Sequence, residues 1–137
     1  MKAVVCSGYG PPDRLQVRRI DQPRPAAGEV LVGVRATTVN RTDSAALRGK
    51  PWFARAVTGL TRPKHQVLGT EFAGHIEAIG ADVTEFSVGD DVFGFNEATS
   101  GAHAQYLVMA ASGPLTTIPP GTDLAEVGAG RDRCQRP

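Results

Sequence analysis

The polar groups able to do chemistry are most concentrated in one run of four residues: Asn40, Arg41, Thr42 and Asp43. Their side chains can hydrogen-bond a ligand, but neutral amide and hydroxyl oxygens are poor substitutes for the thiolate and imidazole that a catalytic zinc prefers. The same side chains are good helix caps, and residues 44–48 form a short helix candidate that Gly49 would end. The residue types alone leave ligand contact and helix capping both open.

Two glycine pairs begin like the phosphate-binding fingerprint of a dinucleotide site: Gly8-Tyr9-Gly10 and Gly128-Ala129-Gly130. In a working fingerprint the glycines follow a strand, open a helix and lie inside a βαβ unit. The first pair runs into two prolines, and the second meets Arg133 where a glycine is needed. We expect neither pair to bind pyrophosphate.

Other side chains have ordinary structural explanations. His75 falls within a strand pattern, where a histidine with a structural partner is expected. Trp52, Phe53 and Val57 have the apolar character of a substrate mouth, but packing in the core is the preferred interpretation. The two cysteines, Cys6 and Cys134, form no CxxC pair and are expected to be free thiols.

The element that organises the chain is a strand predicted from Phe72 to Ile79, where Phe72, Gly74, Ile76 and Ala78 share one face. A turn at residues 80–82, an apolar run at 83–88 and a short strand at 92–95 complete a glycine-punctuated β-meander. Alternating or apolar residues predict further strands at 1–6, 15–20, 29–39 and 102–110. In the third of these, Val30, Val32, Val34 and Ala36 form the expected core face. Residues 118–121 close the domain, and a helix is expected to begin near Asp123.

Composition favours one mainly β domain. The chain has 137 residues, of which 16 are glycine and 10 proline, and it shows few long helical patterns. A net charge of +1 gives no reason to expect nucleic acid or a membrane surface as partner. With no long apolar run and no signal-like start, a cytoplasmic location is expected.

The segment Gly69-Thr-Glu-Phe-Ala-Gly-His-Ile-Glu-Ala-Ile-Gly80, followed by Val88-Gly-Asp-Asp-Val92, closely resembles the GroES-like catalytic domain of the medium-chain dehydrogenase/reductase family. The resemblance extends over residues 1–5, 25–40 and 102–120 and fades after about Val127. It implies a partly open GroES-like β-barrel with short helices over residues 1–127, with 128–137 as a disordered tail. It also implies an oxidoreductase that uses NAD or NADP and acts on a small carbonyl or quinone substrate.

In this family a separate Rossmann domain follows and grips the cofactor. No such domain is present in these residues, so we expect a truncated or frame-shifted product with little turnover alone. The sequence leaves the substrate, the choice of NADH or NADPH and the oligomeric state open.

The resemblance also implies site residues. Zinc-dependent members carry a cysteine ligand where Asn40 stands and a His-Glu pair where Thr70-Glu71 stands, and the loop after Phe95 lacks the cysteines of the family's structural zinc lobe. No metal is therefore expected, and Glu71 is expected to be a buried carboxylate rather than a catalytic one.

Val39-Asn40 with Asp43 resembles the zinc-independent quinone-reductase branch. There, Asn40 and Thr42 would hydrogen-bond the nicotinamide ribose or the substrate carbonyl, Arg41 would face the pyrophosphate, and Asp43 would orient its neighbours. The alternatives are a non-catalytic GroES-like binding module and a fragment of a zinc-type alcohol dehydrogenase.

Overall fold

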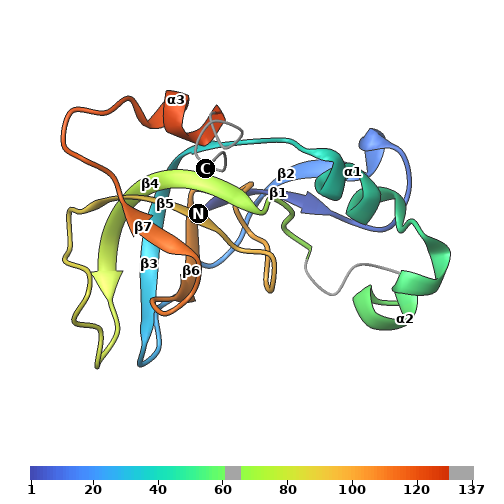
Figure 1. Cartoon of the computed structure of the whole chain (residues 1–137). Coiled ribbons are helices and arrows are strands. Elements are labelled where there is room, and N and C mark those ends of the chain that lie inside the picture. The colour runs from blue at the N-terminus through green and yellow to red at the C-terminus, as the bar shows by residue number, and fades with distance from the viewer. Residues whose placement is uncertain (61–65, 130–137) are drawn as a thin grey trace.

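Seven strands and a few short helices make up residues 1–60 and 66–129, which the computed structural model describes (Figure 1). The strands are β1 (Lys2–Cys6), β2 (Leu15–Arg19), β3 (Glu29–Thr37), β4 (Glu71–Ile79), β5 (Asp91–Phe95), β6 (Tyr106–Ala110) and β7 (Leu115–Thr117). The helices are α1 (Arg41–Arg48), α2 (Arg55–Thr58) and α3 (Leu124–Ala129), with 3-10 turns at Pro12–Arg14 and Trp52–Ala54.

The strands form two antiparallel sheets. Five strands pair in the order β6-β3-β4-β5-β7, and β1 pairs with β2 in a separate two-stranded sheet. No closed barrel forms within the described residues. The predicted mainly β fold with short helices is therefore confirmed, as an open arrangement of sheets.

Period-two alternation on the two central strands builds the core. Val30 and Val32 of β3 are fully buried, and so is Phe72 of β4. These residues pack in one cluster with Ile76 and Val92. Burying each large apolar side chain stabilises the fold by about 2 kcal/mol, so this shared face of β3, β4 and β5 holds the sheet together.

The predicted core face of β3 is confirmed for Val30 and Val32, and Val34 packs against the same cluster while only partly buried. Ala36 is only partly buried and does not belong to the cluster. The pairing of β6 with β3 runs only from Glu29 to Gly33, so the second half of β3 lies beyond that strand. Val34 and Ala36 both line an open groove described below.

The predicted meander is confirmed at β4 and β5 but not between them. Residues 83–88 form no strand. Val83 and Phe86 nevertheless reach the core, each with 9% of its surface exposed. These residues are apolar because they are buried in an irregular connection, and they do not form a third strand.

The strand predicted at 102–110 begins only at Tyr106, because the residues before it bond to β1 instead. The Val4 amide donates to the His103 carbonyl at 2.8 Å, and the Gln105 amide donates to the Lys2 carbonyl at 3.0 Å. Residues 103–105 thereby link the two sheets. The short strand β7 has no counterpart in the sequence-based prediction.

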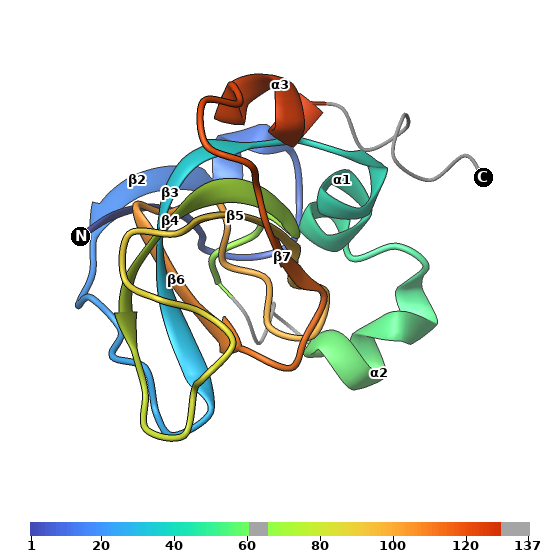
Figure 2. The ribbon, with the colours of Figure 1, turned by 60° about the vertical axis from the view of Figure 1, so that its left-hand side comes forward.

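Helix α3 begins where expected, with the Asp123 carboxylate accepting from the Ala125 amide at 2.8 Å. It continues to Ala129, past the start of the tail predicted at residue 128. The rest of that tail, including Cys134, lies outside the described residues. Helix α3 packs against β3 and β4, and in Figure 2 it lies at the top of the view, with α1 and α2 below it on the right. None of the described helices has the length and apolar character needed to cross a membrane.

Candidate functional site

The run Asn40 to Asp43 forms the first turn of α1 and its cap. The Asp43 amide donates to the Asn40 side-chain oxygen at 3.1 Å, and the Asn40 amide donates to the Asp43 carboxylate at 3.0 Å. This reciprocal capping box satisfies two helix-end donors. Gly49 ends the helix in the left-handed conformation, with φ of 60°. The capping interpretation is therefore confirmed, and it leaves ligand contact open because a cap uses only part of each side chain.

The side-chain NH₂ group of Asn40 contacts Thr70, at the start of the segment 69–80 that carries the family resemblance. Its Nδ2 donates to the Thr70 hydroxyl at 3.2 Å. Thr70 is buried, with 4% of its surface exposed, and directly precedes β4. The two residues that stand at the zinc-ligand positions of the resembling family are thus neutral groups bonded to each other.

Asp43 ties three parts of the chain together while only 5% exposed. Besides capping α1, its Oδ1 accepts from the Gly69 amide at 3.1 Å. Its Oδ2 lies 4.0 Å from Nε2 of His103, which is itself 3.0 Å from the Thr38 carbonyl. Since a carbonyl only accepts, that His103 nitrogen carries a proton and donates to it. The carboxylate is therefore a structural hub behind Asn40.

Glu71 is buried as expected, with 8% of its surface exposed. Its Oε2 accepts from the Thr38 hydroxyl at 2.7 Å, and its carbonyl accepts from the Thr37 hydroxyl at 2.7 Å. The side chain thereby fastens the segment that leads into Asn40 to the start of β4. This placement assigns Glu71 to positioning the loop.

Arg41 and Thr42 differ from their neighbours because both are exposed on the first turn of α1. A guanidinium and a hydroxyl at a helix N-terminus complement a negatively charged group. Of the four predicted site residues, these two are free to meet a ligand, Asn40 is half-buried, and Asp43 is enclosed.

The predicted core packing of Trp52 and Phe53 is wrong. Their exposed fractions are 78% and 65%, and their rings meet edge to face with centroids 6.2 Å apart. They follow the glycine that ends α1, in a 3-10 turn between α1 and α2 that lies away from both sheets (Figure 1). The side chain of Val57 lies outside the described part of the chain.

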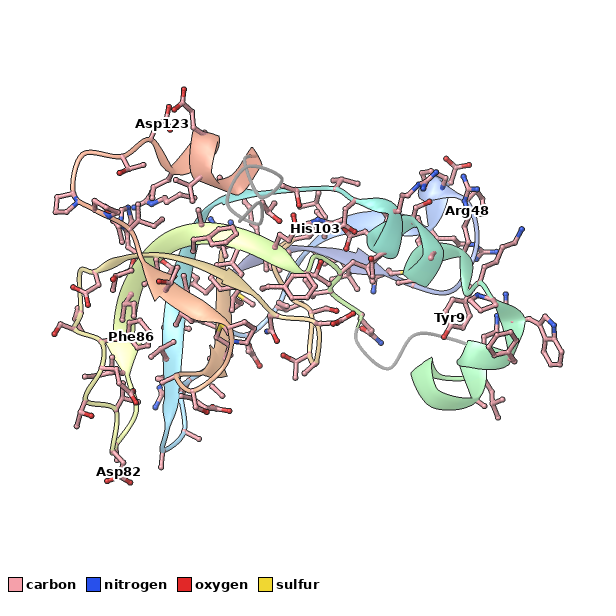
Figure 3. All side chains as sticks on the ribbon, viewed as in Figure 1. Tyr9, Arg48, Asp82, Phe86, His103 and Asp123 are labelled. Carbon is pink, nitrogen blue, oxygen red and sulfur yellow. The ribbon has the colours of Figure 1, made fainter. Side chains whose placement is uncertain are left out.

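Polar and cation–π contacts connect the segment after α1 to Tyr9. The Arg55 guanidinium donates to the Gly49 carbonyl at 3.0 Å and stacks over the Tyr9 ring, 4.7 Å from its centroid. The Tyr9 hydroxyl donates to the Gly59 carbonyl at 2.7 Å. Figure 3 shows Tyr9 near the far end of α1 and His103 nearer its start. Tyr9 belongs to the first glycine pair, which therefore serves this contact and opens no dinucleotide-binding helix.

A groove of about 680 Å³ runs beside α1, between the two-stranded sheet and the second half of β3. Its lining is mainly aliphatic and includes Val17, Val34, Ala36, Val39 and Leu47, with Asp43 and His103 as polar points. A volume of this size and an apolar lining are typical of small-molecule sites.

The described residues contain no group of three or more His, Cys, Asp or Glu side chains placed to hold a metal ion. His75, the remaining histidine candidate, contacts the Asp91 carboxylate on the neighbouring strand through Nδ1. It is the partnered structural histidine that the strand pattern predicted.

A dinucleotide fits these residues only at the edge of the site. Every strand pairing in the described residues is antiparallel, whereas the phosphate-binding crevice of a dinucleotide fold lies at the ends of parallel strands. Arg41, Thr42 and the free lone pair of Asn40 could contact one end of such a cofactor. The described chain offers no cradle for its pyrophosphate.

Asn40 allows a first test of the capped site. Asn40→Ala is expected to lower the free energy of unfolding by about 1 kcal/mol, because it removes the cap of α1. Asn40→Ser is the matched control, since its hydroxyl oxygen can still accept from the Asp43 amide. Urea denaturation measures both, and equal losses for the two variants would contradict a capping role.

Thr38 and His103 are the site residues that sequence reasoning missed. Neither stands in a recognisable motif, and each acquires its role from partners more than 30 residues away in the chain. A local pattern carries no signal for such contacts.

Known proteins resemble this chain over most of its length. Residues 26–120 match the family described as the alcohol dehydrogenase GroES-like domain. A quinone oxidoreductase of Pseudomonas aeruginosa is 31% identical over 128 residues, which are 93% of this chain and 36% of the relative. The synaptic vesicle membrane protein VAT-1 homolog of Danio rerio is 35% identical over 130 residues, 93% of this chain and 25% of the relative.

Among solved structures, the crystal structure of human synaptic vesicle membrane protein VAT-1 homolog-like protein is similar with a TM-score of 0.81 and 28% identity. The match covers 94% of this chain and 38% of that one. This chain thus spans between a quarter and two-fifths of the length of these proteins. The chain therefore belongs to the alcohol dehydrogenase GroES-like domain family of the medium-chain dehydrogenase/reductases.

Proposed function

We propose that this chain is the GroES-like catalytic portion of a zinc-independent, NAD(P)H-dependent reductase of quinones, enones or related carbonyl compounds. The observation that carries the proposal is the hydrogen bond from the Asn40 amide to the Thr70 hydroxyl. Two neutral groups that satisfy each other give a metal ion neither a negative charge nor a free imidazole. The pairing supports a site that orients its ligands by hydrogen bonds.

The roles follow from exposure. Thr42 and the remaining lone pair of Asn40 would orient the nicotinamide ribose or the substrate carbonyl, and Arg41 would face the cofactor's pyrophosphate. Asp43 would act through Asn40, whose backbone it holds. The bound nicotinamide would supply the hydride. The chain's own share would be positioning, for which errors of about 1 Å are costly.

We further propose that turnover depends on a nucleotide-binding domain in addition to the GroES-like residues described above. The chain spans 36% of the quinone oxidoreductase to which it is similar, and its described strands are all antiparallel.

Metal content is the first experimental check. The chain, purified without chelator and then dialysed against zinc, is expected to retain only substoichiometric zinc by elemental analysis. Stoichiometric zinc would overturn the metal-free assignment and favour the zinc-type alcohol dehydrogenase.

A domain exchange tests the activity itself. The chain alone, mixed with NADPH and a quinone, is expected to show no loss of NADPH absorbance above background. Residues 1–120 placed in the Pseudomonas aeruginosa quinone oxidoreductase, in place of the matching segment, should restore reduction. In this chimera Asn40→Ala should lower kcat/KM more than Asn40→Ser does. A folded chimera that reduces neither quinones nor enones would favour a non-catalytic binding module.

A further inference from the structure

The outer edge of β2 is an unpaired strand edge. Within residues 1–60 and 66–129, β2 pairs with β1 and with no other strand. The second edge of β1 is already occupied by residues 103–105, so the sheet can grow only beyond β2. An exposed strand edge is a template for pairing with another strand.

The hydrogen-bonding direction of β2 is fixed by its ends. The Ile20 amide donates to the Met1 carbonyl at 2.9 Å, and the Arg14 carbonyl accepts from the Ser7 amide at 3.1 Å. The backbone groups of successive residues in an antiparallel pair point alternately toward and away from the partner. The even-numbered residues of β2 therefore face β1. The N–H and C=O groups of Val17 and Arg19 point outward, whereas the Leu15 N–H already donates to the Pro12 carbonyl and leaves only the Leu15 carbonyl for a partner.

This edge is complementary to itself in one register. In an antiparallel pair of two β2 strands related by a twofold axis through Val17, Val17 lies opposite its own copy and exchanges two hydrogen bonds with it. Gln16 then lies opposite Arg18, and Leu15 opposite Arg19. In this register no two positively charged side chains lie directly opposite each other, and such a pair would destabilise the sheet.

Neighbouring registers are worse. Centring the axis on Arg19 would set the two copies of Arg19 directly against each other. Centring it on Leu15 would require residues 12–14 to be extended, and these form a 3-10 turn.

The side chains fit the same arrangement. Val17 is 73% exposed and, with Val4 opposite it in the register, lines the apolar groove. Pairing two copies would shelter the two Val17 side chains against each other. Arg18 already donates to the Gln16 side-chain oxygen at 2.6 and 3.0 Å within one strand, so the same polar pair can form across the axis.

We propose that the chain associates with a second copy of itself through β2, forming a four-stranded sheet in the order β1-β2-β2-β1. The interface is small, so the dimer should be weak and reversible. The proposal stands independently of the proposed enzymatic function.

Sedimentation equilibrium over a rising concentration series tests the dimer. Val17→Pro removes the outward N–H of the edge and leaves the bonds to β1 intact, so it should give a monomer at every concentration. Val17→Thr keeps the N–H and the β-branched shape and should still dimerise. A wild-type chain that stays monomeric throughout, or a dimer that survives in folded Val17→Pro, would overturn the proposal.

A charge pair keeps the test decisive if Val17→Pro fails to fold by circular dichroism. Gln16→Glu faces Arg18 of the second copy twice and should tighten the dimer roughly tenfold, whereas Gln16→Lys should weaken it by a similar factor. The difference between the two should shrink in high salt. Equal dimer affinities for the two variants would exclude the β2 interface.

Discussion

Gly74→Ala is expected to abolish stable folding of the chain. A Cβ built on Gly74 would lie 2.1 Å from the carbonyl oxygen of Gly33, a backbone atom on the neighbouring strand. The two residues sit at the centre of the β3–β4 pairing, where the shift needed to relieve the clash would break the ladder. The cost should be several kcal/mol, a large part of the roughly 5–15 kcal/mol that stabilises a typical domain.

Gly80→Ala should behave like Gly74→Ala, because its Cβ would lie 1.7 Å from the Ala26 carbonyl oxygen. Gly8→Ala is the matched control, since nothing lies within 4 Å of its Cβ position and its φ is not positive. Soluble yield and urea denaturation measure all three. If Gly74→Ala unfolds near the urea concentration of Gly8→Ala, the close β3–β4 approach is wrong.

Asp43→Ala should be the most destabilising substitution of a polar side chain at the candidate site. It removes the carboxylate that accepts from the Asn40 and Gly69 amides, and it leaves the Gly69 donor buried without that acceptor. Hydrogen bonds to a charged group contribute about 1.5–3 kcal/mol each, so the loss should be about 3 kcal/mol or more. Such a loss corresponds to a fall in Tm of about 10 °C for a domain of this size.

Asp43→Asn is the control for shape and for neutral hydrogen bonding. It keeps one acceptor oxygen and should cost less than Asp43→Ala by calorimetric melting. If the alanine and asparagine variants melt together, the carboxylate does not hold the loop before β4. If neither variant differs from the parent chain, the hub around Asp43 is absent in solution.

Local patterns in the sequence predicted the parts of the fold that local physics determines. The alternation of β4 and the cap, helix and glycine stop around α1 were predicted because neighbouring residues alone set them. Strand β7 was not, since three residues give too little alternation and it is ordered by pairing with β5. Exposure of Trp52 was also missed, because apolar residues at helical spacing usually mark a buried face.

The candidate site also combines features that the sequence predicts with features that only the tertiary structure shows. The positions of Asn40 and Thr70 followed from the resemblance, but their mutual hydrogen bond joins residues 30 apart and needed the structure. The contacts of Thr38 and His103 are likewise tertiary. The residue types indicated which hydrogen-bonding groups the site contains. The contacts between the start of α1 and residues 69–70 determine which of these groups remain accessible.

The central proposal is that the described residues supply the substrate-facing half of a reductase site and leave the binding of the dinucleotide to another domain. Isothermal titration calorimetry of NADPH into the purified chain tests it most directly. We expect no saturable heat, because Arg41 and Thr42 offer only edge contacts to the cofactor. Saturation at micromolar NADPH with one site per chain would contradict the account.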